Sequence, residues 1–140
     1  MKEKEQIRKL IEMALEARKK AYAPYSHFLV GAALLCRDGS IYTGCNVENA
    51  SYPASNCAER TAVFKAVSEG RRDFVAAAIM GGREGEESLE DCTPCGICRQ
   101  VFAEFGDGDM VVVTGTSPRD YRKYTLKELL PHSFTGKNLQ

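Results

Sequence analysis

Asn56-Cys57-Ala58-Glu59-Arg60, together with the Thr-Pro-Cys-Gly-Ile-Cys-Arg-Gln stretch at residues 93–100, decides the fold of this chain. Each stretch predicts the first turn of a helix, with Asn56 and Thr93 as N-caps and Pro94 at the first helical position. A helix N-terminus carries about half a positive charge and lowers the pKa of a thiol placed there. Each helix start is therefore expected to present cysteine in the thiolate form that binds metal.

Two such helix starts facing each other would gather Cys57, Cys95 and Cys98 around one ion. Three protein ligands leave the fourth tetrahedral position of zinc for water, which distinguishes a catalytic site from a closed structural one. A structural alternative adds Cys92 as a fourth ligand, because Cys92-x-x-Cys95 is also zinc-ligand spacing. A thioredoxin-like pair at Cys95 and Cys98 is a further alternative, but it leaves Cys57 and the residues after it unexplained.

Length and charge limit the classes of protein that fit. A chain of 140 residues predicts a single domain over residues 1–140. Lys and Arg total 19, as do Asp and Glu, so the chain lacks the basic footprint of a protein that binds nucleic acid or a membrane surface. We therefore expect a small neutral substrate, with no nucleic-acid or membrane partner.

The start of the chain and its cysteines indicate a cytoplasmic protein. Residues 1–5 are charged and lead into an amphipathic segment, and no apolar run is long enough to span a membrane. Six cysteines could form disulfides in a secreted chain, but the missing signal and the CxxC spacing favour reduced thiols and metal. Cys36 and Cys45 fall in predicted strands and are expected to be small buried residues.

The rest of the sequence predicts alternating helices and strands. A helix is expected over residues 3–22, ended by Pro24, and strands at residues 28–36, 40–45, 74–80, 109–114 and 121–125. Asp38-Gly39 predicts a hairpin between the first two strands. Helices between later strands favour parallel pairing through crossover connections. We predict a three-layer α/β/α domain on a mixed five-stranded sheet.

The two cysteine motifs resemble those of the zinc-dependent nucleoside deaminases, and specifically the small homotetrameric cytidine deaminases. The resemblance covers nearly the whole chain, because it extends to residues 21–26 (AYAPYS), Phe28, residues 30–33 (VGAA) and 44–50 (GCNVENA), Glu104 and residues 128–131 (ELLP). It implies the same α/β/α fold and one Zn²⁺ per chain. It also implies a homotetramer of pyrimidine salvage that deaminates cytidine and 2′-deoxycytidine hydrolytically, with release of ammonia.

Glu59 has a structural and a catalytic interpretation. On spacing alone, Asn56-x-x-Glu59 is a variant capping box in which the glutamate closes the helix start. The zinc-ligand motif around it favours catalysis instead. In deaminases of this type, zinc activates a water that attacks carbon 4 of cytosine, and a glutamate moves the protons. We expect Glu59 to take the proton of the water, deliver it to ring nitrogen 3 and help to protonate the departing amine.

Arg60 is a candidate for offsetting excess negative charge, because the charge of three thiolates is larger than the positive charge of one dication. It follows Glu59 directly and can donate hydrogen bonds to ligand sulfurs, a contact that tunes the metal. The alternative is an arginine on a solvent-facing side of the helix. Arg99 is a weaker candidate for the same role.

Several other residues are candidates for contacting substrate. Asn46 and Glu48 lie two apart at a strand end, so both side chains would point to the same side of an extended segment. Spacing alone fits a solvated loop, but the resemblance implies that both bind the sugar. It also implies that Phe28 packs on the pyrimidine, where the alternative is a core phenylalanine, and that Ala58 contacts the substrate.

The resemblance further implies active sites shared between subunits. Phe134 matches an aromatic residue that reaches a neighbouring subunit's site, and Tyr52 lies in a loop that approaches an adjoining subunit. The sequence does not separate such contacts from packing within one chain. His27 and His132 match no zinc ligand and are assigned no role.

Three alternative functions stay open beside cytidine deamination. A deaminase of the blasticidin type shares the zinc motifs, but the Asn-Val-Glu-Asn stretch at residues 46–49 counts against it. A structural zinc-binding module would need a fourth protein ligand and no open water position. A nucleic-acid editing deaminase would need a basic groove, which the neutral composition does not favour.

Overall fold

The sheet of the computed structural model, which describes residues 2–140, has the strand order β2-β1-β3-β4-β5. Its strands are β1 (Phe28–Cys36), β2 (Ile41–Cys45), β3 (Phe74–Arg83), β4 (Gly106–Ser117) and β5 (Asp120–Thr125). β3 and β4 pair in parallel, whereas the other neighbouring strands are antiparallel. The predicted mixed five-stranded sheet is confirmed.

The predicted hairpin joins β1 to β2. Cys36 N donates to the Ser40 carbonyl oxygen at 2.9 Å, which closes a loop of residues 37–39, and Gly39 has a φ of +92°. A three-residue hairpin loop requires this left-handed conformation at its last position, and glycine adopts it without a steric cost. The Asp38-Gly39 pattern therefore identified the turn correctly.

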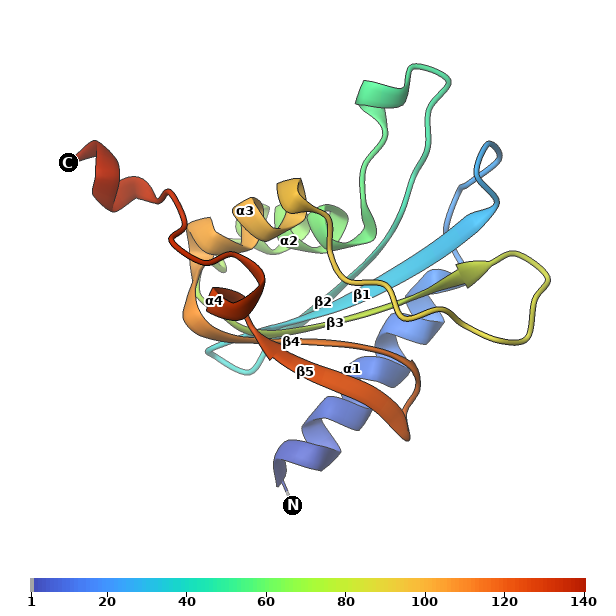
Figure 1. Ribbon diagram of the computed structural model, residues 1–140, viewed down its shortest axis with the longest axis horizontal. Helices are drawn as coiled ribbons and strands as arrows, with labels where there is room; N and C mark the ends of the chain where they lie inside the picture. The colour runs from blue at the N-terminus through green and yellow to red at the C-terminus, as the bar shows by residue number, and fades with distance from the viewer. Residues whose placement is uncertain (1) are drawn as a thin grey trace.

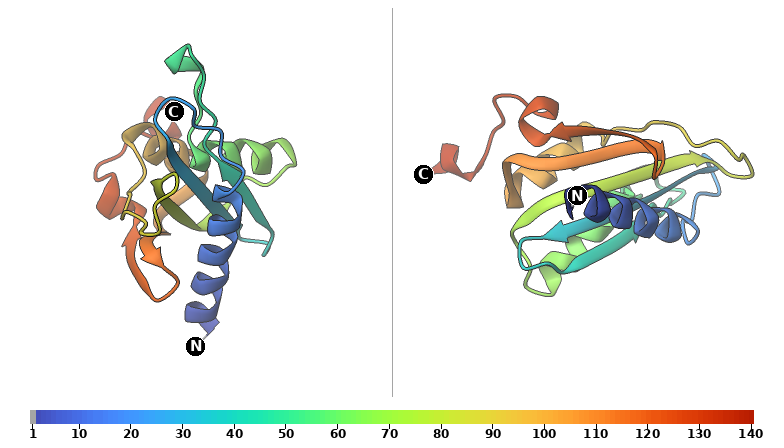
Figure 2. Two further views of the ribbon diagram at one scale, coloured as in Figure 1. Left: turned by 90° about the vertical axis from the view of Figure 1, so that its right-hand side faces the viewer. Right: turned by 90° about the horizontal axis from the view of Figure 1, so that it is seen from below.

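Helices cover both faces of the sheet, as Figure 1 and the right-hand view of Figure 2 show. The helix α1 (Lys2–Arg18) packs alone on one face, against a cluster that includes Ala33 and Leu35 of β1. On the other face lie α2 (Ala58–Ser68), α3 (Gly96–Phe105) and the short α4 (Leu126–Leu129), above a cluster that includes Ala32 and Leu34. Alternate residues of β1 thus serve two cores, which explains its unbroken apolar sequence and confirms the three-layer architecture.

The two long helices of the second face provide the crossovers. α2 connects β2 to β3, and α3 connects β3 to its parallel neighbour β4. Since β1 runs antiparallel to both β2 and β3, the strands β2, β3 and β4 run in one direction. The starts of α2 and α3 therefore lie at the same end of the sheet, which is the condition for a shared site.

Element ends differ from the prediction where side chains or glycines intervene. α1 ends at Arg18, four residues before the expected end, because Tyr22 already bonds to the Asn46 carbonyl oxygen at 3.0 Å. The Arg18 guanidinium donates to the carbonyl oxygens of Leu29 at 2.8 Å and Gly82 at 2.7 Å and so ties the helix end to the sheet. β3 continues to Arg83, since Gly81 and Gly82 still pair with β1.

The end of the chain holds structure that the sequence did not predict. α4 begins at a capping box in which Thr125 and Glu128 bond each other's backbone. The final 3₁₀ turn, η2 (Gly136–Leu139), lies on a tail that leaves the body of the molecule (Figure 1). No helix in the described residues is long and apolar enough to cross a membrane.

Candidate active site

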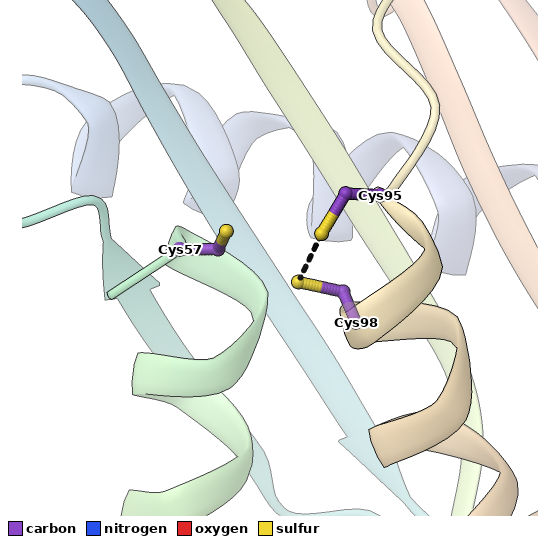
Figure 3. Close-up of side chains that lie close together, drawn as sticks. All are labelled: Cys57, Cys95 and Cys98. Carbon is purple, nitrogen blue, oxygen red and sulfur yellow. Dashed lines mark hydrogen bonds between the residues drawn. The ribbon is translucent and has the colours of Figure 1, made fainter. Parts of the chain in front are cut away.

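Cys57 and Cys95 are themselves the N-caps of α2 and α3, so the prediction of Asn56 and Thr93 as N-caps is wrong. The carbonyl oxygens of the two cysteines accept the first helical hydrogen bonds, at 3.0 and 2.9 Å. Their side chains make no capping bond. Each sulfur can therefore point into the space between the two helices (Figure 3).

The residues before each helix have other partners, which explains the shift. The backbone of Asn56 exchanges two hydrogen bonds with Val47, at 2.9 and 3.0 Å, and this bridge keeps Asn56 extended. Thr93 accepts a hydrogen bond from Arg99 at 3.3 Å, and Pro94 lies before α3, not at its first position.

The sulfurs of Cys57, Cys95 and Cys98 form one cluster, with all three within 4.8 Å of one another. Cys95 Sγ lies 3.6 Å from Cys98 Sγ, the contact drawn in Figure 3. Tetrahedral zinc with Zn–S bonds of about 2.3 Å places its sulfurs about 3.8 Å apart. The donor set and its spacing therefore fit a zinc ion with one position left for a non-protein ligand.

The contacts within this cluster favour ionisation of Cys57 and oppose ionisation of Cys98. Hydrogen bonds from Cys98 and then from Arg60 help to lower the pKa of Cys57 to about 5, against the effect of burial. The hydrogen bond between Cys98 and Cys57, with burial, raises the pKa of Cys98. A dication is the group that would relieve this opposition and hold all three as thiolates.

Arg60 has the predicted contact with a ligand sulfur, because its Nη2 donates to Cys57 Sγ at 3.2 Å. The same bond raises the pKa of Arg60 and keeps its charge beside the cluster. Arg99 does not share this role. Its guanidinium instead donates to the carbonyl oxygens of Pro94 and Leu129, both at 2.7 Å, and so anchors the start of α3 to the end of α4.

Glu59 is buried in the first turn of α2, with 5% of its surface exposed. No capping box forms at this helix start, since Cys57 occupies the cap and caps nothing with its side chain. Burial raises the pKa of Glu59 to about 7. A carboxyl group with such a pKa is suited to both accepting and donating a proton near neutral pH.

A cavity of about 380 Å³ opens above the cysteine cluster. Its lining includes most residues selected from the sequence: Phe28, Asn46, Glu48, Tyr52, Cys57, Ala58, Glu59, Arg60 and Cys95. These residues come from β1, the loop after β2, η1 (Tyr52–Ala54) and the two helix starts. The fold thus brings together a metal-ligating cluster, a buried carboxyl group and an apolar wall.

Asn46 and Glu48 line the cavity but also bind backbone. Asn46 Oδ1 accepts from Val30 N at 2.9 Å, and its Nδ2 donates to the Phe28 carbonyl oxygen at 2.8 Å. Glu48 Oε1 accepts from the amides of Tyr25 and Ser26, at 3.0 and 3.1 Å. Both side chains are therefore fixed in place, and each retains further hydrogen-bonding capacity.

The two aromatic residues predicted to reach a neighbouring subunit occupy different places. Tyr52 lines the cavity mouth, is 70% exposed, and packs edge-on to Tyr25 with ring centroids 6.0 Å apart. Phe134 is 58% exposed and does not line this cavity; its carbonyl oxygen accepts from Gln100 at 2.8 Å. The structure of one chain therefore does not bring Phe134 to the cavity.

The other cysteines lie apart from the cluster. Cys92 lines the cavity, but its sulfur is not grouped with the other three, and burial is the main cause that raises its pKa to about 11. Cys36 is buried in β1, and Cys45 is partly buried in β2. His27 pairs with exposed Glu84 at 3.4 Å and does not join the metal cluster.

The sequence did not single out some residues at the cavity. Ile79 and Ser55 line it, and Ser26 contacts Glu48 from the loop before β1. Ile79 is buried in β3, and the sequence pattern does not distinguish it from the other apolar residues of that strand. Ser26 belongs to residues 21–26, which carry part of the family resemblance. Its partner Glu48 is 22 residues away, and no local pattern predicts that contact.

With the geometry established, comparison with known proteins identifies the family. Residues 4–114 match the family model described as the cytidine and deoxycytidylate deaminase zinc-binding region. The chain belongs to this family. The curated cytidine deaminase of Halalkalibacterium halodurans is 51% identical over 130 residues, which cover 93% of this chain and 95% of that protein.

Solved structures agree with this membership. The crystal structure of cytidine deaminase from Burkholderia pseudomallei has a TM-score of 0.79 and 50% sequence identity, covering 90% of this chain and 97% of that one. A blasticidin-S deaminase of Bacillus cereus is 30% identical over 129 residues, with 90% of each chain covered. The relatives named cytidine deaminase are thus about 50% identical to this chain, and the relative named blasticidin-S deaminase is 30% identical.

Proposed function

We propose that this chain is a zinc-dependent cytidine deaminase that hydrolyses cytidine and 2′-deoxycytidine to uridine and 2′-deoxyuridine, with release of ammonia. The observation that carries the proposal is the convergence of three cysteine sulfurs and buried Glu59 at one cavity. A closed structural zinc site would need a fourth protein ligand, and the described cluster supplies three.

Cys57, Cys95 and Cys98 would hold the zinc, with Arg60 beside them to offset negative charge. When bound, zinc supplies the Lewis acidity that makes water a nucleophile near neutral pH. Glu59 performs the proton transfers: it accepts a proton from the attacking water, passes it to ring nitrogen 3 and helps to protonate the departing amine.

The cavity wall provides recognition of the nucleoside. Phe28 and Ala58 offer apolar surface for the pyrimidine, while Asn46 and Glu48 offer polar groups for the sugar hydroxyls. Identity to the cytidine deaminases near 50% favours cytidine over blasticidin S, for which the relative is 30% identical. The second candidate function is accordingly deamination of blasticidin S.

The assembly is a further part of the proposal. We infer a homotetramer in which Phe134 from the exposed tail completes the site of another subunit, with Tyr52 near that contact. Exposed aromatic side chains on a projecting segment are suited to such a contact. No nucleic-acid or membrane partner is proposed, and a cytoplasmic location and a role in pyrimidine salvage stay predictions.

Ultraviolet absorbance and ammonia release on a panel of substrates test the function. We expect turnover of cytidine and 2′-deoxycytidine, and far less of free cytosine, cytidine monophosphate and blasticidin S. A site built to bond the sugar hydroxyls leaves its polar groups unpaired when free cytosine binds. The carboxylate of Glu48 near the sugar disfavours the phosphate of cytidine monophosphate. The Glu48→Ala variant should lose efficiency mainly on cytidine, with zinc content unchanged.

The panel separates the candidate functions. Preferred turnover of blasticidin S would establish the second candidate and leave the zinc chemistry intact. Bound zinc without turnover of any aminonucleoside would contradict the enzyme proposal and favour a structural zinc module. Turnover of cytidine by Glu48→Ala equal to wild type would contradict the sugar-binding role of Glu48.

A further inference from the structure

Ser26 connects two residues of the cavity wall that lie far apart in the sequence. Its hydroxyl donates to Glu48 Oε2, and Ser26 Oγ accepts a hydrogen bond from Phe28 N at 3.0 Å. The amide of Ser26 also donates to Glu48 Oε1 at 3.1 Å. One serine thus contacts both the proposed sugar-binding carboxylate and the backbone of the proposed base-binding aromatic.

The contacts to Glu48 leave its carboxylate little freedom. Both oxygens accept hydrogen bonds, Oε1 from the amides of Tyr25 and Ser26 and Oε2 from the Ser26 hydroxyl. The Ser26 hydroxyl is the first of the causes that lower the pKa of Glu48, which keeps the carboxylate ionised. Hydrogen bonds to an ionised acceptor are stronger than neutral ones.

The backbone of Phe28 is bonded at both its amide and its carbonyl oxygen by side chains of neighbouring residues, Ser26 and Asn46. Its amide donates to Ser26 Oγ at 3.0 Å, and its carbonyl oxygen accepts from Asn46 Nδ2 at 2.8 Å. The preceding residue, His27, has a φ of +59°, a conformation that non-glycine residues seldom adopt. The chain therefore turns sharply just before Phe28, and side-chain hydrogen bonds fix where the aromatic residue lies.

We propose that Ser26 is a positioning residue, which orients Glu48 toward the sugar and Phe28 toward the base through a single hydroxyl group. The proposal rests on the proposed function for the identity of the ligand, a pyrimidine nucleoside. Ser26 itself does not line the cavity above the cluster. It acts through its two neighbours and takes no part in proton transfer.

The kinetic test compares Ser26→Ala with Ser26→Thr on cytidine. Loss of the hydroxyl removes two hydrogen bonds, so Ser26→Ala should raise KM about tenfold, with kcat within about threefold of wild type. Threonine retains a hydroxyl and should restore most of the affinity. Because Ser26 and Glu48 act together, Ser26→Ala should cost less in a Glu48→Ala background than in wild type.

Ser40→Ala is the matched control. The hydroxyl and the amide of Ser40 both donate to the carboxylate of Asp38, a similar arrangement in the hairpin at the opposite end of β1. This variant should leave KM unchanged. Equal thermal midpoints for the Ser26 and Ser40 variants would show that the KM effect is not a loss of stability.

Amide hydrogen exchange tests the same contacts without substrate. Ser26→Ala should speed exchange of the Phe28 amide about tenfold, whereas Ser40→Ala should not. An unchanged Phe28 amide overturns the proposal, as does a KM within twofold of wild type in active Ser26→Ala. If wild type fails to deaminate cytidine, the proposed function fails, and the exchange result still decides whether Ser26 holds Phe28.

Discussion

At the scale of single residues, burial raises the pKa of two side chains in the same cavity, Glu59 and Cys92, with different results for their chemistry. Burial raises the pKa of Glu59 to about 7, which allows one group to take and return a proton near neutral pH. Burial also raises the pKa of Cys92 to about 11, which keeps that thiol protonated, and its sulfur lies outside the cluster of three. Proximity to the cavity alone therefore does not make Cys92 part of the metal site.

Replacement of Glu59 by glutamine tests the acid–base role. Glutamine keeps the shape of the side chain but transfers no proton, so cytidine turnover should fall by about 100- to 10,000-fold or more. Zinc content, measured by atomic absorption, should stay at the wild-type level. Turnover within tenfold of wild type would contradict the proton-transfer role of Glu59.

Replacement of Cys92 by serine tests the ligand set. The Cys92 sulfur lies outside the cluster of three, so Cys92→Ser should hold as much zinc as wild type and turn over cytidine at a similar rate. Cys98→Ser is the matched comparison, because its sulfur belongs to the cluster, and it should lose the metal. Loss of zinc from Cys92→Ser would indicate a closed four-cysteine site.

At the scale of elements, the sequence predicted which segments form but not how they begin. The CxxC spacing and the Cys-x-Glu stretch identified both metal helices, because ligand spacing is a local property. The caps were misplaced because Asn56 is held by Val47, a tertiary contact. The contact of Ser26 with Glu48 spans 22 residues and was missed for the same reason.

Gly44 of β2 controls how closely α2 approaches the sheet. A Cβ there would lie 2.5 Å from Ala62 N and 2.6 Å from Ala58 O, too close for any real contact with backbone. Gly44→Ala should therefore lower the free energy of unfolding by about 1–3 kcal/mol or more. It should also reduce turnover, since the start of α2 carries Cys57. Denaturant unfolding and cytidine turnover measure the two effects.

Gly136→Ala is the control for this prediction. A Cβ at Gly136 meets nothing within 4 Å, and its backbone requires no left-handed conformation. This variant should match wild type in stability. Equal stability of the Gly44 and Gly136 variants would contradict the close packing of β2 against α2.

At the scale of the whole molecule, the exposed tail is the feature that one chain leaves unexplained. Phe134 and Leu139, two large apolar residues of this tail, are 58% and 78% exposed. The sequence predicted a role for Phe134 only through family resemblance, because local pattern does not reveal contacts between subunits. The proposed shared active site would account for both the exposure and the position of the tail.

Mixing two defective variants tests the shared site. Glu59→Gln should lack proton transfer, and Phe134→Ala should lack the aromatic contact with the neighbouring site. Co-assembly of the two chains should restore some cytidine turnover, because some sites then combine both intact residues. Each variant assembled alone serves as the control. A monomeric mass by light scattering at full wild-type activity would contradict this assembly.

The most direct test of the central claim is removal and return of the metal from the intact protein. The claim is that Cys57, Cys95 and Cys98 hold a zinc ion on which deamination depends. Chelation should abolish ammonia release from cytidine, and added Zn²⁺ should restore it in proportion to binding, with full activity at about one ion per chain. Full turnover of cytidine by protein that contains no zinc would contradict the account.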